Sequence, residues 1–158
     1  LGLVGSEMCI RDRCHGGSML LHPVVHLHLF NSCGELYLQK RPAWKDIQPG
    51  RWDTAVGGHV DWGEEPLAAL RREVREEVGV TDFEPQHVLT YLFESERERE
   101  LVYVYKTVYD GPVVPSGELD GGRFWTLREI AEGVGGGIFT PNFEGEIRRV
   151  AELPDVGR

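Results

Sequence analysis

Apolar and polar residues alternate along two early segments of the chain. Residues 23–30, PVVHLHLF, are rich in β-branched side chains and alternate throughout, which predicts a strand. Residues 35–40, ELYLQK, alternate again after a turn at residues 31–34. We therefore expect the two segments to pair as a hairpin. His26 and His28 share one face of the first strand, and we interpret them as structural because no third nitrogen or sulfur ligand is evident.

A change of period separates this hairpin from a helix. Residues 41–53 contain Pro, Gly and Trp and predict a loop, whereas residues 54–60 predict one short strand. The pattern becomes helical over residues 64–78, with Pro66 in the first turn and Gly79 as a left-handed cap. The apolar arc of this helix, which we expect to face a sheet, consists of Leu67, Leu70, Val74 and Val78.

The second half of the chain repeats both kinds of pattern. Residues 86–94, 101–110 and 122–126 predict strands, and helices are expected from residue 127 and over residues 142–153. Strands on both sides of an early helix favour a mixed α/β sandwich over a regular βαβ array. The sequence shows no internal repeat or linker, so residues 14–158 are expected to form a single domain.

Composition narrows the classes of protein that fit. The chain has 158 residues and a net charge of −9, typical of one soluble domain, and contains no apolar run long enough for a membrane span. Net negative charge disfavours nonspecific nucleic-acid binding. The three cysteines, Cys9, Cys14 and Cys33, form no metal-binding pair and favour a reducing compartment, so we expect a cytoplasmic protein.

The first thirteen residues differ in character from the rest of the chain. The string GSEMCIRDR resembles a translated sequencing adapter, and residues 1–13 lack the features of a secretory signal. We interpret residues 1–13 as an adapter artefact, with a short or disordered natural arm as the alternative. On this interpretation the native N-terminus is missing.

Three glutamates gather on one side of the predicted helix. Glu73, Glu76 and Glu77 occupy an arc of about 100°, beside the apolar stripe, and they repel one another. Arg72 is the only cation beside them, and Ala69 within the arc leaves room for a ligand. A divalent cation would remove the repulsion. A solvated acidic helix face is the alternative from this arc alone.

The segment around these glutamates has a specific spacing. Gly58 is followed by five residues and Glu64, then by seven residues and the run REVREEVGV over residues 72–80. This matches every fixed position of the Nudix box, G-x5-E-x7-R-E-U-x-E-E-x-G-U with U aliphatic. The chain therefore resembles the Nudix hydrolase family, which implies an α/β/α sandwich with a mixed sheet and hydrolysis of a nucleoside diphosphate linked to another group.

The resemblance implies roles for the residues of the box. Arg72 would orient the glutamates, and Glu64 would support the loop–helix–loop geometry between the box glycines Gly58 and Gly79. The bound ion would be Mg²⁺ or Mn²⁺, and the carboxylates would complete proton transfer. The implied metal ligands are three glutamates and one backbone carbonyl: Glu73, Glu76, Glu77 and the carbonyl of Gly57.

A second acidic segment lies downstream of the box. Strand alternation would place Glu96, Glu98 and Glu100 on one face. Many Nudix proteins have an extra catalytic or metal-binding glutamate in this region. We assign that role to Glu100, with Glu98 as the alternative.

Residues 39–59, QKRPAWKDIQPGRWDTAVGGH, resemble the Nudix branch that contains isopentenyl-diphosphate isomerase. That enzyme has a cysteine before its Gly-His dipeptide, where this chain has Gly57, and its box is usually degraded. An intact box therefore favours hydrolysis over isomerisation. The expected substrate contacts are four cations, one aromatic residue and one histidine: Lys40, Arg41, Lys45, Arg51, Trp52 and His59.

The sequence thus predicts a Mg²⁺-dependent hydrolase that cleaves a small diphosphate. An isopentenyl-diphosphate isomerase-like enzyme and a non-catalytic nucleotide-binding Nudix module are the alternatives. The expected partner is a small-molecule diphosphate, with no nucleic acid and no membrane, and the protein is a monomer or homodimer. The group attached to the diphosphate and the bond that breaks are left open.

Overall fold

A computed structural model describes residues 20–41, 50–117 and 121–157. The proposed adapter segment and Lys45 lie outside these residues. None of the helices in the described ranges could cross a lipid bilayer. The described elements, in chain order, are β1 (Leu21–Phe30), β2 (Leu36–Lys40), β3 (Trp52–Thr54), β4 (Val56–His59), α2 (Pro66–Val78), β5 (Gln86–Glu94), β6 (Arg99–Val108), β7 (Gly122–Trp125), α3 (Leu127–Gly133) and α4 (Pro141–Val150).

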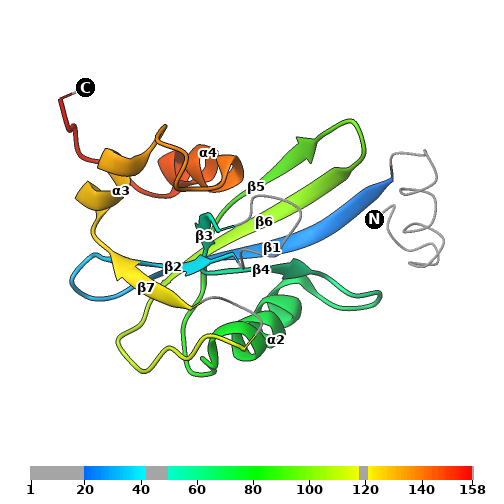
Figure 1. The fold of residues 1–158 in the computed structure, drawn as a ribbon. Helices are drawn as coiled ribbons and strands as arrows, with labels where there is room; N and C mark the ends of the chain where they lie inside the picture. The colour runs from blue at the N-terminus through cyan, green and yellow to red at the C-terminus, as the bar shows by residue number, and fades with distance from the viewer. Residues whose placement is uncertain (1–19, 42–49, 118–120, 158) are drawn as a thin grey trace.

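The strands of the described ranges form one mixed seven-stranded sheet (Figure 1). Its main path runs β3-β2-β1-β6-β5, while β4 pairs with β1 and β7 pairs with β2. Strand β1 pairs in parallel with β6 along its whole length, and antiparallel with both β2 and β4. The expected hairpin of β1 and β2 is confirmed, and β1 is the centre of the sheet.

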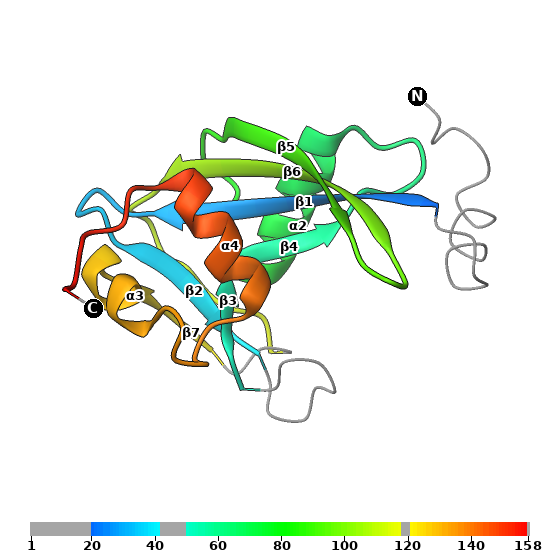
Figure 2. The same ribbon diagram turned by 90° about the horizontal axis from the view of Figure 1, so that it is seen from above.

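Helices cover both faces of this sheet. Helix α2 lies on one face, and α3 and α4 lie on the other (Figures 1 and 2). Leu70, Val74 and Val78 of α2 are fully buried against one side of the sheet. Phe143 and Ile147 of α4 are fully buried in a separate cluster on the opposite side. The predicted α/β/α sandwich with a mixed sheet is therefore confirmed.

The prediction of one strand over residues 54–60 is wrong. The chain bends at the fully buried Ala55, which divides the segment into β3 and β4. The two pieces belong to different pairs, because β3 pairs with β2 whereas β4 pairs with β1. Strand β3 also begins at Trp52, inside the predicted loop.

Helix α2 differs from its prediction at its first turn and in its buried face. It begins at Pro66 instead of residue 64, because Glu65 has extended backbone angles and occupies the N-cap. Leu67, which was expected in the apolar arc, is 42% exposed. Ala69, which was expected to leave room for a ligand, is fully buried in the core. The buried face therefore extends across the glutamate arc, and Gly79 caps the helix at φ 70° as predicted.

Candidate active site

Arg72 connects helix α2 to the loop that precedes it. Its Nε and Nη2 atoms donate to the two carboxylate oxygens of Glu64 at 2.9 and 3.0 Å, and Nη2 also donates to the carbonyl of His59 at 3.0 Å. Glu64 accepts a third bond from the backbone N–H of Asp61 at 2.9 Å. The hydrogen bond from Arg72 is the main reason that the pKa of Glu64 lies below its usual value. Together these bonds fix the loop against the helix.

Glu73 and Glu77 form a pair of acids between α2 and the sheet. Arg72 Nη1 donates to Glu73 Oε2 at 2.9 Å, and the Glu73 side chain is only 16% exposed. Burial, followed by the interaction with Glu73, raises the pKa of Glu77 to about 8. The backbone N–H of Gly57 and the amide of Gln39 also donate to Glu77. Two half-buried neighbouring acids of this kind favour a nearby cation.

The glycine pair of β4 permits this close approach. A Cβ atom on Gly58 would overlap the carboxylate of Glu73, so only glycine fits there. Gly57 lies opposite His26 on β1 and precedes the position that faces Glu73. The Gly-Gly sequence therefore brings the backbone of β4 directly against the paired carboxyl groups.

Glu76 does not join the pair. Its side chain is 56% exposed and lies 3.5 Å from Arg72 Nη1. Among the described residues, no three acidic, histidine or cysteine side chains converge as a metal site. The donors that do meet are carboxylate oxygens and a peptide group, which is the donor chemistry that Mg²⁺ and Mn²⁺ prefer. Glu73, Glu77 and the backbone at Gly57 therefore fit such an ion, and ligation by Glu76 stays a prediction.

The downstream glutamates separate in the structure. Glu100 lies on β6, in register with His22 of β1. Burial, followed by the charge of Glu98, raises the pKa of Glu100, and His26 and His59 oppose that rise. Glu100 therefore lies near His26 and His59, and its register partner His22 is on the same face of β1 as His26. Its role as a ligand stays a prediction.

The expected alternation of Glu96 and Glu98 with Glu100 is wrong. The backbone N–H of Ser95 donates to the carbonyl of Glu98 at 2.8 Å, which closes a turn between β5 and β6. The Ser95 hydroxyl accepts from the backbone N–H of Glu98 at 3.1 Å. Strand β6 therefore begins only at Arg99, after both glutamates.

The predicted cationic contacts lie at the β2–β3 end of the sheet. Lys40 ends β2 and pairs with Trp52 across the strands. Arg41 lies 3.8 Å from Asp53, and Arg51 donates to the carbonyl of Phe139 at 3.4 Å. Both arginines therefore also contact protein groups. Their contact with a substrate stays a prediction.

The two other residues that the sequence predicts as substrate contacts, Trp52 and His59, have aromatic rings. Trp52 packs edge-on against Trp125, with ring centroids 5.2 Å apart, so part of its surface contributes to the core beneath α3 and α4. His59 ends β4, and its ring lies edge-on to His22 at 6.3 Å. His59 is exposed beside the Arg72–Glu64 loop, whereas Trp52 has the packing role that is common for a large aromatic residue near a turn.

Sequence analysis missed Glu146. This residue of α4 is 3% exposed and accepts hydrogen bonds from His26, His28 and the hydroxyl of Tyr91. The structural interpretation of both histidines agrees with these contacts. The only sequence signal was an acid on the apolar side of a predicted helix, three residues after Phe143.

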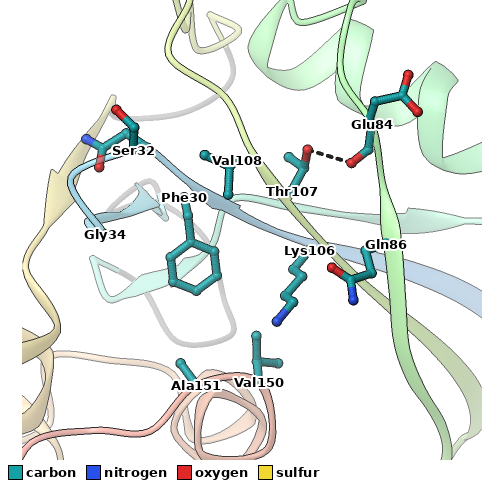
Figure 3. A pocket seen from close by; sticks show the side chains of 11 residues that line it. Phe30, Ser32, Gly34, Glu84, Gln86, Lys106, Thr107, Val108, Val150 and Ala151 are labelled. Atoms are coloured by element: carbon teal, nitrogen blue, oxygen red, sulfur yellow. Dashed lines mark hydrogen bonds between the residues drawn. The ribbon is translucent and has the colours of Figure 1, made fainter.

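A cavity of about 830 Å³ opens at the far end of β1, and Figure 3 shows Lys106 and Gln86 extending into it. The cavity contains no residue of the box, so we assign it no part in the site. Its lining consists of Phe30, Asn31, Ser32, Gly34, Glu84, Gln86, Lys106, Thr107, Val108, Val150 and Ala151.

Comparison with known proteins identifies the family. Residues 20–143 match the family model described as the NUDIX domain. The chain belongs to the Nudix family. Its Nudix box is the segment from Gly58 to Val80, and all the contacts of Arg72, Glu73 and Glu77 described above arise within this box or from the strands beside it.

Relatives of this Nudix chain have more than one named activity. An isopentenyl-diphosphate Delta-isomerase of Serratia proteamaculans is 31% identical over 82% of this chain and 72% of its own length. An uncharacterised Nudix hydrolase of Pseudomonas aeruginosa is 36% identical over 61% of this chain, and the match spans 57% of that protein.

Solved structures share the fold. The Deinococcus radiodurans protein DR0079 superimposes with a TM-score of 0.71 at 25% identity, covering 81% of this chain and 82% of the other. A MutT protein of Methanosarcina mazei gives a TM-score of 0.69 at 24% identity over 83% and 93% of the two chains.

Proposed function

We propose that this chain is a Mg²⁺- or Mn²⁺-dependent Nudix hydrolase that cleaves the diphosphate linkage of a nucleoside diphosphate derivative or a related small diphosphate. The observation that supports it most strongly is the half-buried pair of Glu73 and Glu77 against the Gly57–Gly58 backbone. Burial and mutual repulsion raise the pKa of Glu77 to about 8. Such an arrangement is unfavourable for a protein unless a cation joins it.

The box residues would each hold one part of the site. Glu73, Glu77 and the carbonyl of Gly57 would bind the cation, with Glu76 and Glu100 as the further proposed ligands. Once bound, the cation would polarise the phosphoryl group and lower the pKa of the attacking water. Arg72 holds Oε2 of Glu73 in place, and the backbone N–H of Gly57 holds the carboxyl group of Glu77. The protein therefore contributes position and charge.

A metal-dependent substrate screen tests this function. The purified protein is incubated with a panel of nucleoside diphosphate derivatives and small diphosphates, with and without Mg²⁺, and phosphate and pyrophosphate release are measured separately. Glu77→Gln should lower kcat/KM at least about 100-fold, because even residues that only orient the ligands of a metal contribute 10–100-fold. Glu65→Gln is the matched control, since it removes one exposed acid from the opposite end of the same helix.

The same screen separates the alternatives. Conversion of isopentenyl diphosphate to dimethylallyl diphosphate without phosphate release would show that the protein is an isomerase and would contradict the proposed hydrolase function. Gly57 stands where the isomerase has its cysteine, so we expect no such conversion. Tight nucleotide binding without turnover would indicate a binding module. Full activity in Glu77→Gln would contradict the assignment of the metal site.

A further inference from the structure

Glu146 ties helix α4 to two strands of the sheet through one buried carboxylate. His26 Nδ1 lies 2.9 and 3.0 Å from its two oxygens, and His28 Nε2 lies 2.7 Å from Oε1. The hydroxyl of Tyr91 on β5 donates to Oε2 at 2.6 Å. Burial opposes the charge on Glu146, but hydrogen bonds from His26 and His28 outweigh it and hold its pKa well below the usual range. The carboxylate is therefore a fully bonded anchor.

The pairing of β1 with β4 determines where the peptide groups of Gly57 point. The backbone N–H of Val60 donates to the carbonyl of Pro23 at 3.0 Å, so Pro23 and Val60 form a hydrogen-bonded pair. Such pairs alternate along antiparallel strands. His26 and Gly57, three residues further along the register, are thus a pair without mutual backbone bonds. The N–H and C=O of Gly57 point away from β1, and the N–H reaches Glu77.

The ring of His26 covers Gly57 on the α4 side of the sheet. Side chains of residues paired without mutual backbone bonds approach most closely. A Cβ atom on Gly57 would lie 3.4 Å from Cδ2 of His26, which is ordinary packing distance. The edge of the ring opposite Nδ1 therefore lies over the place that a side chain on Gly57 would occupy, while Nδ1 is bound to Glu146.

We propose that Glu146 acts through His26 to hold the Gly57 peptide in the orientation that serves Glu77 and the metal. His26 is thus a positioning residue on the face of the sheet opposite the catalytic helix. A slip of one residue between β1 and β4 would turn the Gly57 peptide inward. The bonds from His26 and His28, two residues apart on β1, oppose that slip by fixing β1 against α4. This inference rests on the proposed function only for the role of the Gly57 carbonyl.

His26→Asn separates the anchor from the ring. The asparagine amide can occupy the place of Nδ1 and keep a donor to Glu146, while the ring edge over Gly57 is lost. We expect Gly57 amide exchange, measured by NMR relative to β5–β6 amides, to speed several-fold. We also expect Mn²⁺ binding to the protein alone, followed by electron paramagnetic resonance, to weaken about tenfold. Glu146→Gln serves the same two measurements if His26→Asn does not fold.

His28→Gln is the matched control. It keeps a donor near the position of Nε2 for Glu146, but His28 lies two residues past the partner of Gly57. Unchanged Gly57 exchange and Mn²⁺ affinity in His28→Gln support a specific role for His26. Equal losses in both variants, or wild-type values in His26→Asn, overturn the inference. Neither readout needs a substrate, so a protein without hydrolase activity would refute the proposed function alone.

Discussion

The two faces of the sheet each bury carboxyl groups, and they treat them in opposite ways. Beneath α2, Glu77 lies beside Glu73, and burial together with that neighbour raises its pKa to about 8. Beneath α4, Glu146 is bonded to two histidines and a tyrosine, and those bonds lower its pKa despite burial. One acid is destabilised by its surroundings, and the other is stabilised by them.

This difference supports the proposed location of the active site on the α2 face. A buried acid whose donors are all supplied by the protein contributes to stability and has little left to offer a ligand. A half-buried pair of neighbouring acids is costly to ionise, and a bound cation would lower that cost. The contrast therefore supports the proposal that the α2 face binds the cation, while the α4 face has an anchoring carboxylate.

The largest test of the contrast removes the anchor. Glu146→Ala leaves His26, His28 and Tyr91 without their acceptor, and we expect the free energy of unfolding to fall by about 3–5 kcal/mol. Chemical denaturation measures the change. Glu144→Ala on the same helix removes one hydrogen bond, to the backbone of Gly135, and should cost about 1 kcal/mol. Equal losses in the two variants would abolish the distinction between an anchor and an ordinary acid.

The next test concerns the hydrogen bonds from Arg72 to Glu64 and Glu73 on the α2 face, which we call the clamp. Arg72→Lys keeps the positive charge but cannot reproduce the two parallel bonds to Glu64 together with the bond to Glu73. We expect kcat/KM to fall about 10–100-fold with little change in melting temperature. Arg71→Lys, one residue away and directed to Phe83, is the control and should retain wild-type rates.

Replacing Glu77 should change the free energy of unfolding in the opposite direction to replacing Glu146. Without metal, Glu77→Gln replaces a carboxyl group that burial and Glu73 make costly to ionise with a neutral amide, so the free energy of unfolding should rise by roughly 1 kcal/mol or more, the equivalent of one pKa unit. Denaturation in the presence of a chelator measures it. Destabilisation of the metal-free protein would show that Glu77 is also an anchor.

A change of pH should have a smaller effect on stability, through Glu146 and His26 on the α4 face. The contribution of Glu146, whose pKa is lowered, is present above its unfolded value of about 4.3. Burial works against the charge on His26, but Glu146 raises its pKa, so this contribution is complete below about 6.5 and lost as pH rises through the folded value. The melting temperatures of wild type and Glu146→Gln should therefore differ most between about pH 5 and 6.5. A difference that grows towards pH 9 would contradict this.

The smallest effect is expected at the start of α2. Leu67 is 42% exposed, although its helical position suggested burial. Leu67→Ala should change the free energy of unfolding by less than about 0.5 kcal/mol. Val74→Ala, at a fully buried position of the same helix, is the comparison and should cost clearly more.

The arrangement of the residues on the α2 face could be predicted from sequence, because their geometry is local. Arg72, Glu73 and Glu77 lie within two turns of one helix, so their spacing alone places them together. The clamp to Glu64 spans only eight residues. The alternation of strand and helix patterns predicted a mixed α/β sandwich, and the resemblance to the Nudix family implied its α/β/α layers.

The anchoring half could not be predicted. Glu146 finds His26 across 120 residues of sequence, and no periodicity within α4 specifies a partner on β1. The bend at Ala55 could not be predicted either. It arises because β3 pairs with β2 whereas β4 pairs with β1, and the local sequence does not specify these partners. The exposure of Leu67 depends on where the first turn of α2 lies relative to the sheet. Helical periodicity alone does not give that position.

The central position of β1 also constrains the order in which the molecule folds. Its parallel partner β6 aligns Leu21 with Arg99, so the middle of the sheet requires closure of a loop of nearly eighty residues. The Nudix loop and helix, in contrast, involve only nearby residues and can form early. The bond between Glu146 and His26 requires the longest closure of those described here. We therefore expect the active-site peptide to be ordered late in folding, when α4 docks and completes the register of β1.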